Sequence, residues 1–250
     1  MKSLWPHRSV FAFAVLIGLV LGCKSTTTSS TTNNKEEGPK STNSSNSRTN
    51  TGSATAPDIA GTYNVTGSNP EGGQYKGTLE VIARGDVYQF HWNAGMQYDG
   101  IGIQNGNIIA VAFANGADGK GCGVVDYDIR SDGSLNGKWG YWGVNEAGTE
   151  SARRTSGSGL VGEYDANGKN PDGKTYQAHL TVESAGNLFH FSWSNNTDGV
   201  AIKRGNNVAV GIGGQRCGFV VYQVQSDGSL DGTWGGGGSD KTGTEKATKQ

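Results

Sequence analysis

Histidine, aspartate and glutamate are the side chains in this sequence that can act as general acids, general bases or metal ligands. His91, His179 and His190 follow no metal-binding spacing such as His-x-x-Glu-His, and we interpret them as surface residues. Glu150 and Glu245 each follow Gly-Thr, where a glutamate can bind calcium, act as an acid, make a structural hydrogen bond or remain an exposed charge. The sequence has no Gly-x-Ser-x-Gly elbow and no phosphate-binding loop. It therefore predicts no enzyme, no cofactor and no metal site.

Cys122 and Cys217 begin two closely similar segments, CGVVDYDIRSDGSLNGKWG and CGFVVYQVQSDGSLDGTWG. Side chains alternate along a strand, so Cys122 lies on the face opposite Val125 and Tyr127. If Val125 and Tyr127 face the core, both cysteines point outward and can form a disulfide between two units of the chain. The alternative is two separate thiols, each packed as a small apolar side chain.

Cys23 follows a basic start and an uncharged apolar run at residues 10–21, which is too short for a permanent membrane span. Val20-Leu21-Gly22-Cys23 resembles the lipobox of bacterial lipoproteins. This resemblance implies a signal peptide at residues 1–22, a diacylglyceryl thioether on Cys23, and acylation of the new amino terminus. The expected partner of Cys23 is therefore a membrane.

Residues 23–56 are rich in Ser, Thr and Asn and contain no aromatic side chain. Such a composition cannot bury enough apolar area to offset chain entropy, so it predicts a disordered tether. Lys24 stands where enteric inner-membrane lipoproteins have Asp. By resemblance to that sorting rule, we expect attachment to the outer membrane if the host is Gram-negative.

The rest of the chain contains two copies of one unit, expected at residues 57–155 and 159–250. The matches keep the same order in both copies. They include Tyr75 with Tyr176, Trp92 with Trp193, Cys122 with Cys217, Trp139 with Trp234 and Glu150 with Glu245.

Each copy alternates apolar and polar residues in short runs that are separated by glycine-rich turns such as Asp132-Gly133 and Asp227-Gly228. Short links require antiparallel neighbours. We therefore predict an all-β protein with two tandem antiparallel meanders of about eight short strands each. The strands are expected to close into small calycin-like barrels, with a β-sandwich as the alternative. Tyr88, Phe90 and Trp92 share one face, which predicts core positions.

The unit is similar to small secreted bacterial domains, some of which are described as fibronectin-binding proteins. The resemblance lies in G-x-Y, N-P-[ED]-G, a Phe-x-Trp strand, S-D-G-S-L-x-G-x-W and a final G-T-E. It implies macromolecular binding, with an extracellular-matrix protein or an envelope glycan as partner. The alternative is a barrel that binds a small hydrophobic ligand. With 21 basic and 22 acidic residues, the chain has no excess of positive charge that would favour nucleic acid.

Overall fold

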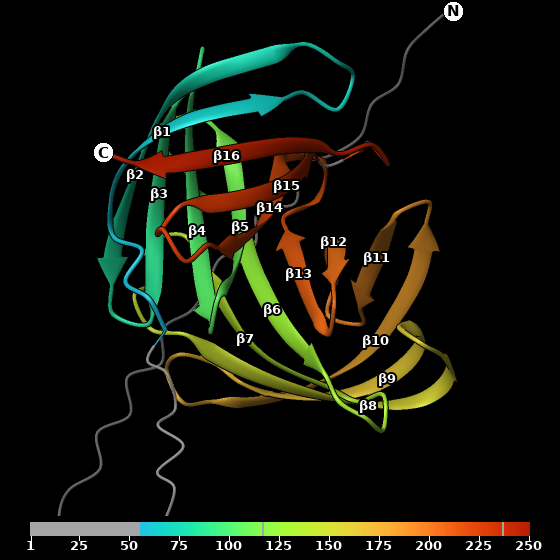
Figure 1. The fold of residues 1–250 in the computed structure, drawn as a ribbon. Helices are drawn as coiled ribbons and strands as arrows, with labels where there is room; N and C mark the ends of the chain where they lie inside the picture. The colour runs from blue at the N-terminus through green and yellow to red at the C-terminus, as the bar shows by residue number, and fades with distance from the viewer. Residues whose placement is uncertain (1–55, 117, 237) are drawn as a thin grey trace, which may run out of the picture. The chain divides into compact units, whose positions relative to one another are not determined.

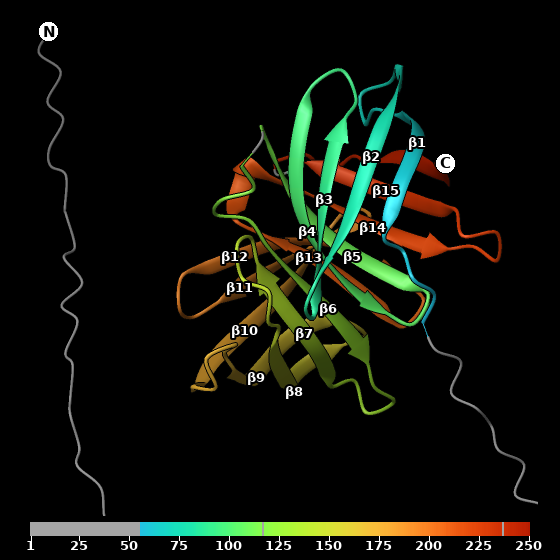
Figure 2. The ribbon, with the colours of Figure 1, turned by 90° about the vertical axis from the view of Figure 1, so that its left-hand side faces the viewer.

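The computed structural model describes residues 56–116, 118–236 and 238–250. The expected signal peptide, Cys23 and the tether up to residue 55 lie outside the described residues. The described part of the chain forms sixteen β-strands and one short 3₁₀ helix, Gly214–Arg216. The strands are antiparallel and close into two eight-stranded barrels, which confirms the predicted all-β class and excludes the β-sandwich (Figures 1 and 2).

The first barrel is closed in the order β1-β16-β15-β14-β5-β4-β3-β2. Its strands are β1 (Gly61–Ser68), β2 (Gln74–Arg84), β3 (Val87–Asn93), β4 (Gln97–Asn105), β5 (Ile108–Asn115), β14 (Cys217–Val224), β15 (Leu230–Gly236) and β16 (Gly243–Lys249).

The second barrel is closed in the order β10-β11-β12-β13-β6-β7-β8-β9. Its strands are β6 (Gly123–Ile129), β7 (Leu135–Tyr141), β8 (Gly148–Ser158), β9 (Val161–Lys169), β10 (Thr175–Ala185), β11 (Leu188–Trp193), β12 (Thr197–Arg204) and β13 (Asn207–Ile212). This barrel is one continuous stretch of chain, inserted between β5 and β14 of the first.

The barrels do not follow the sequence repeats. Each copy places five strands in one barrel and three in the other, because β5 pairs with β14 and β13 pairs with β6. The expected boundary between the copies lies within a hairpin of the second barrel, where β8 ends at Ser158 and β9 begins at Val161. The two repeats therefore exchange their last three strands within one chain.

Three apolar clusters stabilise this arrangement. One fills the inside of the first barrel and includes Phe90 and Trp92, as the alternation of β3 predicts. A second fills the inside of the second barrel, and a third lies between the barrels. β5 is buried on both faces: Ile109 belongs to the interior of the first barrel, whereas the small side chain of Ala110 packs between the barrels. This explains why its sequence, IIAVAFAN, does not alternate with polar residues.

Cys122 and Cys217 are joined in a disulfide, with their Cα atoms 5.8 Å apart. Both point away from the interior of their own barrel, but the neighbouring barrel covers them, and they are 1% and 5% exposed. Cys122 precedes β6 in the second barrel, and Cys217 begins β14 in the first. The bond therefore joins the two places where the chain crosses from one barrel to the other.

The crossing from β13 to β14 requires a glycine. Gly213 has φ +126°, and a Cβ added there would lie 2.3 Å from the Cys217 sulfur and 2.5 Å from the Gly121 carbonyl oxygen. A side chain at this position would clash with the disulfide and with the other crossing segment. The local sequence thus brings the two crossings close enough for the cysteines to bond.

Candidate binding cavities

Glu245 is a buried carboxylate inside the first barrel, only 6% exposed. The period-two alternation of β16 turns Glu245 inward together with Ala247. Tyr75 donates a hydrogen bond of 2.8 Å to Glu245 Oε2, and the Trp92 indole donates one of 3.0 Å to Oε1. The Tyr222 hydroxyl also donates to Oε1. Two of these donors come from the first repeat and one from the second, so the cluster depends on the strand exchange.

Glu150 occupies the equivalent place in the second barrel and is 5% exposed. It accepts hydrogen bonds from the Tyr176 hydroxyl at 2.7 Å, from the Trp193 indole at 3.1 Å and from the Tyr127 hydroxyl. The two barrels thus contain the same cluster, a glutamate bound by two phenols and one indole. Both glutamates thus make the structural hydrogen bonds that were one of their expected roles.

The tyrosines of these clusters keep their protons. Burial raises the pKa of Tyr75 above its ordinary value, and the neighbouring charge of Glu245 raises it further. The same two causes raise the pKa of Tyr222 and, with Glu150 as the neighbour, those of Tyr127 and Tyr176. The phenols therefore stay protonated at any ordinary pH and donate their hydrogen bonds to the two glutamates.

A cavity of about 580 Å³ opens from one end of the first barrel, and Glu245 lies among its lining residues. Its wall is a continuous series of aromatic rings. Trp92 lies 5.7 Å from Phe113, which in turn lies 5.9 Å from Tyr98 and 6.2 Å from Trp234. Met96, which is 56% exposed, also lines the cavity. The first cavity is therefore mostly aromatic, with one buried carboxylate.

The second barrel has a smaller cavity of about 270 Å³ around Glu150. Tyr141 fills part of it and packs against Trp139 at 5.7 Å. The equivalent residue in the first barrel is Gly236, where an added Cβ would meet nothing within 4 Å. Ile212 likewise stands in the place of Phe113. The two cavities therefore share a carboxylate but differ in volume and in aromatic wall.

A third hollow, of about 340 Å³, is lined by residues of both barrels, including Asn105 and Asp126. Asp126 is 3% exposed, and its Oδ1 atom has no hydrogen-bond partner among the described residues. Burial raises the pKa of Asp126 to about 7, and the charge of Asp128 adds to the shift. The second repeat has Val221 at this position, packed between the barrels. Asp126 is thus a carboxylate in a position that the other copy fills with an apolar side chain.

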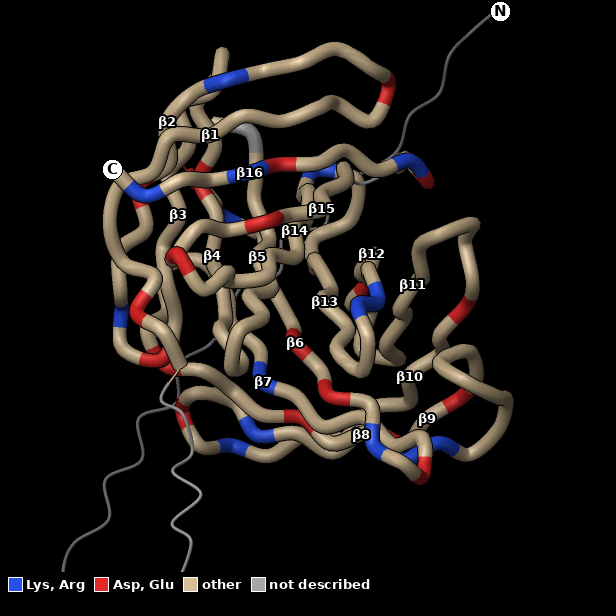
Figure 3. Tube along the Cα trace, in the orientation of Figure 1, with Lys and Arg blue, Asp and Glu red and all other residues tan. Residues whose placement is uncertain are grey.

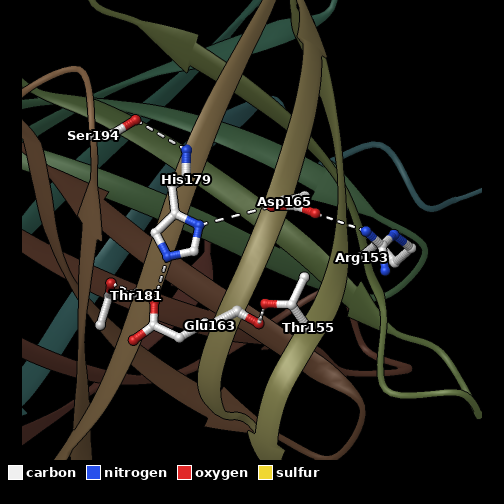
Figure 4. A network of polar contacts seen from close by, with 7 residues as sticks. All are labelled: Arg153, Thr155, Glu163, Asp165, His179, Thr181 and Ser194. Atoms are coloured by element: carbon white, nitrogen blue, oxygen red, sulfur yellow. Dashed lines mark hydrogen bonds and ion pairs between the residues drawn. The ribbon is translucent and has the colours of Figure 1, made fainter.

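The histidines lie apart from these cavities. His179 contacts Glu163 at 2.7 Å and Asp165 at 3.8 Å on the exposed outer face of the second barrel, as Figure 4 shows. His91 contacts Asp99 at 2.7 Å, and His190 is exposed. The exposed contacts of His179 contribute little to stability, whereas the Asp99 partner of His91 is buried.

Lys and Arg positions are interspersed with Asp and Glu positions along the described part of the chain (Figure 3). Within residues 56–116, 118–236 and 238–250, no group of three His, Cys, Asp or Glu side chains is arranged to hold a metal ion. No helix in the same residues is long and apolar enough to cross a membrane.

The repeated glutamates are recognisable in the sequence, but their hydrogen-bond partners are not predicted from it. The signal was present, because both tyrosines and the tryptophan of each cluster recur in the two copies, as Tyr75 with Tyr176, Trp92 with Trp193 and Tyr127 with Tyr222. Alternation along the strand predicts only a core position for Trp92. Its buried ring also donates to Glu245, and this contact depends on which strands share a barrel.

No protein-family model, curated protein or solved structure matches this chain. The fold and the cavities define a class, a double-barrel protein with a larger cavity in one barrel and a smaller one in the other. The resemblance to lipoproteins and to fibronectin-binding domains stays a prediction from the sequence.

Proposed function

We propose that this chain is a lipid-anchored binding protein of the cell envelope that takes a small ligand into the cavity of the first barrel. The observation behind this proposal is the open aromatic cavity of about 580 Å³ with Glu245 among its lining residues. Ligand sites are commonly concave, of this size, and mostly apolar with a few placed polar groups. The deep interior of the barrel is filled by Tyr63, Phe90 and other core residues, so the ligand occupies the mouth.

A pocket is favoured over a flat adhesive surface. Among the described residues, the large apolar side chains that are exposed are Met96, Val144 and Val161. They are separate in the sequence, and one of them, Met96, lines the first cavity. Adhesive apolar patches usually extend over several hundred Å². A matrix protein or envelope glycan, the partner expected from the sequence, would therefore engage the cavity through a small protruding group.

The lipid anchor supplies the location in this proposal. It rests on Val20-Leu21-Gly22-Cys23 and on the tether composition, both outside the described residues. The composition predicts a disordered tether, and a disordered chain of roughly 30 residues reaches about 30 Å, which would hold the barrels away from the lipid headgroups.

The test is a fragment screen by nuclear magnetic resonance on the mature chain, with Gly236→Tyr as the blocking variant. Gly236 shares a strand face with Trp234, and the equivalent Tyr141 already fills the second cavity. The substitution therefore has space and closes the first cavity without disturbing the fold. We expect fragments to shift signals of the first cavity in the native chain and to lose that effect in Gly236→Tyr.

The matched control is Tyr141→Gly, which enlarges the second cavity and leaves the first unchanged. Fragments that bind the native chain and the Gly236→Tyr variant equally would place binding elsewhere. A screen in which no fragment binds the first cavity would overturn the proposal.

A further inference from the structure

The first cavity has an unbalanced charge. Glu245 accepts three hydrogen bonds, all from neutral phenol or indole groups. In the described part of the chain, no Lys, Arg or His nitrogen lies within 4 Å of its carboxylate oxygens. A buried carboxylate without a cationic partner is costly, and a positively charged group beside it recovers part of that cost.

The carboxylate also has an unused acceptor position. Oε1 accepts from both Trp92 and Tyr222, whereas Oε2 accepts only from Tyr75. Each carboxylate oxygen can accept about two hydrogen bonds, so Oε2 has room for one more donor. Glu245 lines the cavity, and the missing donor can come from a ligand there.

The aromatic wall favours the same kind of ligand. The faces of Trp and Tyr rings are the negative ends of their quadrupoles and attract cations, with Trp the strongest. Trp92, Tyr98, Phe113 and Trp234 all line the cavity with Glu245. The cationic residue that lines the cavity is Arg216, which is exposed and whose guanidinium lies beside Gly121, at the chain crossing.

We propose that the ligand of the first cavity is an organic ammonium ion whose cationic nitrogen lies among the aromatic rings near Glu245. This inference rests on the proposed function, since it names the ligand class of the same cavity. An anion would be repelled by Glu245, and a neutral ligand would leave its charge unbalanced. The second cavity has the glutamate but lacks the volume and the equivalent of Phe113, so it binds such ions more weakly.

The test compares three probes of nearly equal shape by calorimetry and tryptophan fluorescence on the mature chain. They are choline, its neutral isostere 3,3-dimethylbutan-1-ol, and the anion 3,3-dimethylbutyrate. We expect choline to bind at least about tenfold more tightly than the alcohol, because it gains both cation–π and carboxylate attraction. We expect no measurable binding of the anion. Choline binding should disappear in Gly236→Tyr.

Three variants assign the effect to named residues. Glu245→Gln should weaken the binding of choline about tenfold or more and leave the affinity for the alcohol nearly unchanged, since it removes the negative charge. Glu150→Gln is the matched control in the second barrel and should change neither the affinity for choline nor the affinity for the alcohol. Phe113→Ile introduces the residue that the other copy has at this position, so the fold should be kept. It should weaken the binding of choline severalfold, because one aromatic ring is lost. It keeps the proposal testable if Glu245→Gln fails to fold.

The outcomes separate the two proposals. If the alcohol binds as tightly as choline and Gly236→Tyr abolishes both, the cavity is a ligand site but the ammonium proposal is wrong. Preferential binding of the anion would also overturn the ammonium proposal. If none of the three probes binds while fragments of the earlier screen do, only the ammonium proposal fails. If nothing binds the cavity, the proposed function fails with it.

Discussion

Asp126 is a buried carboxylate at a position where the other copy has an apolar side chain. It lies between the barrels, where its repeat equivalent is the buried Val221. Lys138 is its cross-strand neighbour on β7, yet the two make no ion pair within 4 Å. Burial disfavours the charged carboxylate, so the pKa of Asp126 is raised from 3.8 to about 7.

This shift predicts that the protein loses stability as the pH rises. Between pH 3.8 and about 7 the folded state holds a proton on Asp126 that the unfolded state has released. The resulting stabilisation is complete below the unfolded pKa and is lost as the pH rises through the folded pKa, with a total of up to about 4 kcal/mol. Urea unfolding between pH 5 and 8 should show this fall in the free energy of unfolding.

The variant Asp126→Asn should remove most of that fall, because its side chain does not titrate. Asp231→Asn, at an exposed carboxylate of β15, is the control and should keep the native pH profile. If Asp126→Asn and the native chain have parallel profiles, the titration belongs to another group.

At the scale of the elements, the sequence predicts the strands and turns better than their partners. Asp132-Gly133 and Asp227-Gly228 do form hairpin turns, with φ +80° and +77° at the two glycines. The exchange of strands could not be predicted, because β6 and β14 descend from the same segment. In the pairing of β5 with β14, Phe113 lies opposite Gly218. In the pairing of β13 with β6, the equivalent Ile212 lies opposite the equivalent Gly123. Either pairing satisfies the same ladder and the same alternation.

The same ambiguity limits what the sequence says about the site. Glu245 is recognisable because it recurs, and the aromatic face of β3 is recognisable by alternation. The contact between Glu245 and Trp92 joins residues of different repeats. It follows only when β16 closes the barrel that contains β3. Periodicity within one strand cannot predict this contact between strands that lie far apart in the sequence.

The disulfide at the strand crossings should stabilise the exchange. The bond closes a loop between residues 95 positions apart, and such a link restricts the unfolded chain. Removing it in Cys122→Ala/Cys217→Ala should cost about 2–5 kcal/mol of unfolding free energy. Guanidinium unfolding of the double variant and of the native chain, with and without reductant, measures this.

Reductant alone should reproduce the effect in the native chain and change nothing in the double variant. Equal stability of the oxidised native chain and the double variant would show that the bond contributes nothing. The double variant keeps two small apolar side chains at the buried positions, so packing losses are kept low.

At the scale of the whole molecule, duplication has produced two barrels with different degrees of filling. The apolar cluster between them takes residues from β3, β4, β5 and β14 of the first barrel and from β6, β11, β12 and β13 of the second, so each barrel covers an outer face of the other. The second barrel has less free volume at its glutamate because Tyr141 stands where the first has Gly236. The first barrel therefore keeps the larger cavity at its glutamate, and this is the cavity that the proposed binding function uses.

The proposed anchoring of the whole molecule depends on one thiol. Cys23→Ser should abolish incorporation of labelled palmitate, since the diacylglyceryl thioether needs the sulfur. Stable anchoring requires more than one acyl chain, and the variant cannot carry the two chains of the diacylglyceryl group. It should therefore move from the membrane fraction to the soluble fraction of the envelope. Cys122→Ser, which leaves Cys23 intact, is the control and should remain labelled and membrane-bound. A Cys23→Ser protein that still takes up palmitate, or that still sediments with membranes, would contradict the lipoprotein assignment and require a different account of how the barrels are held at the envelope.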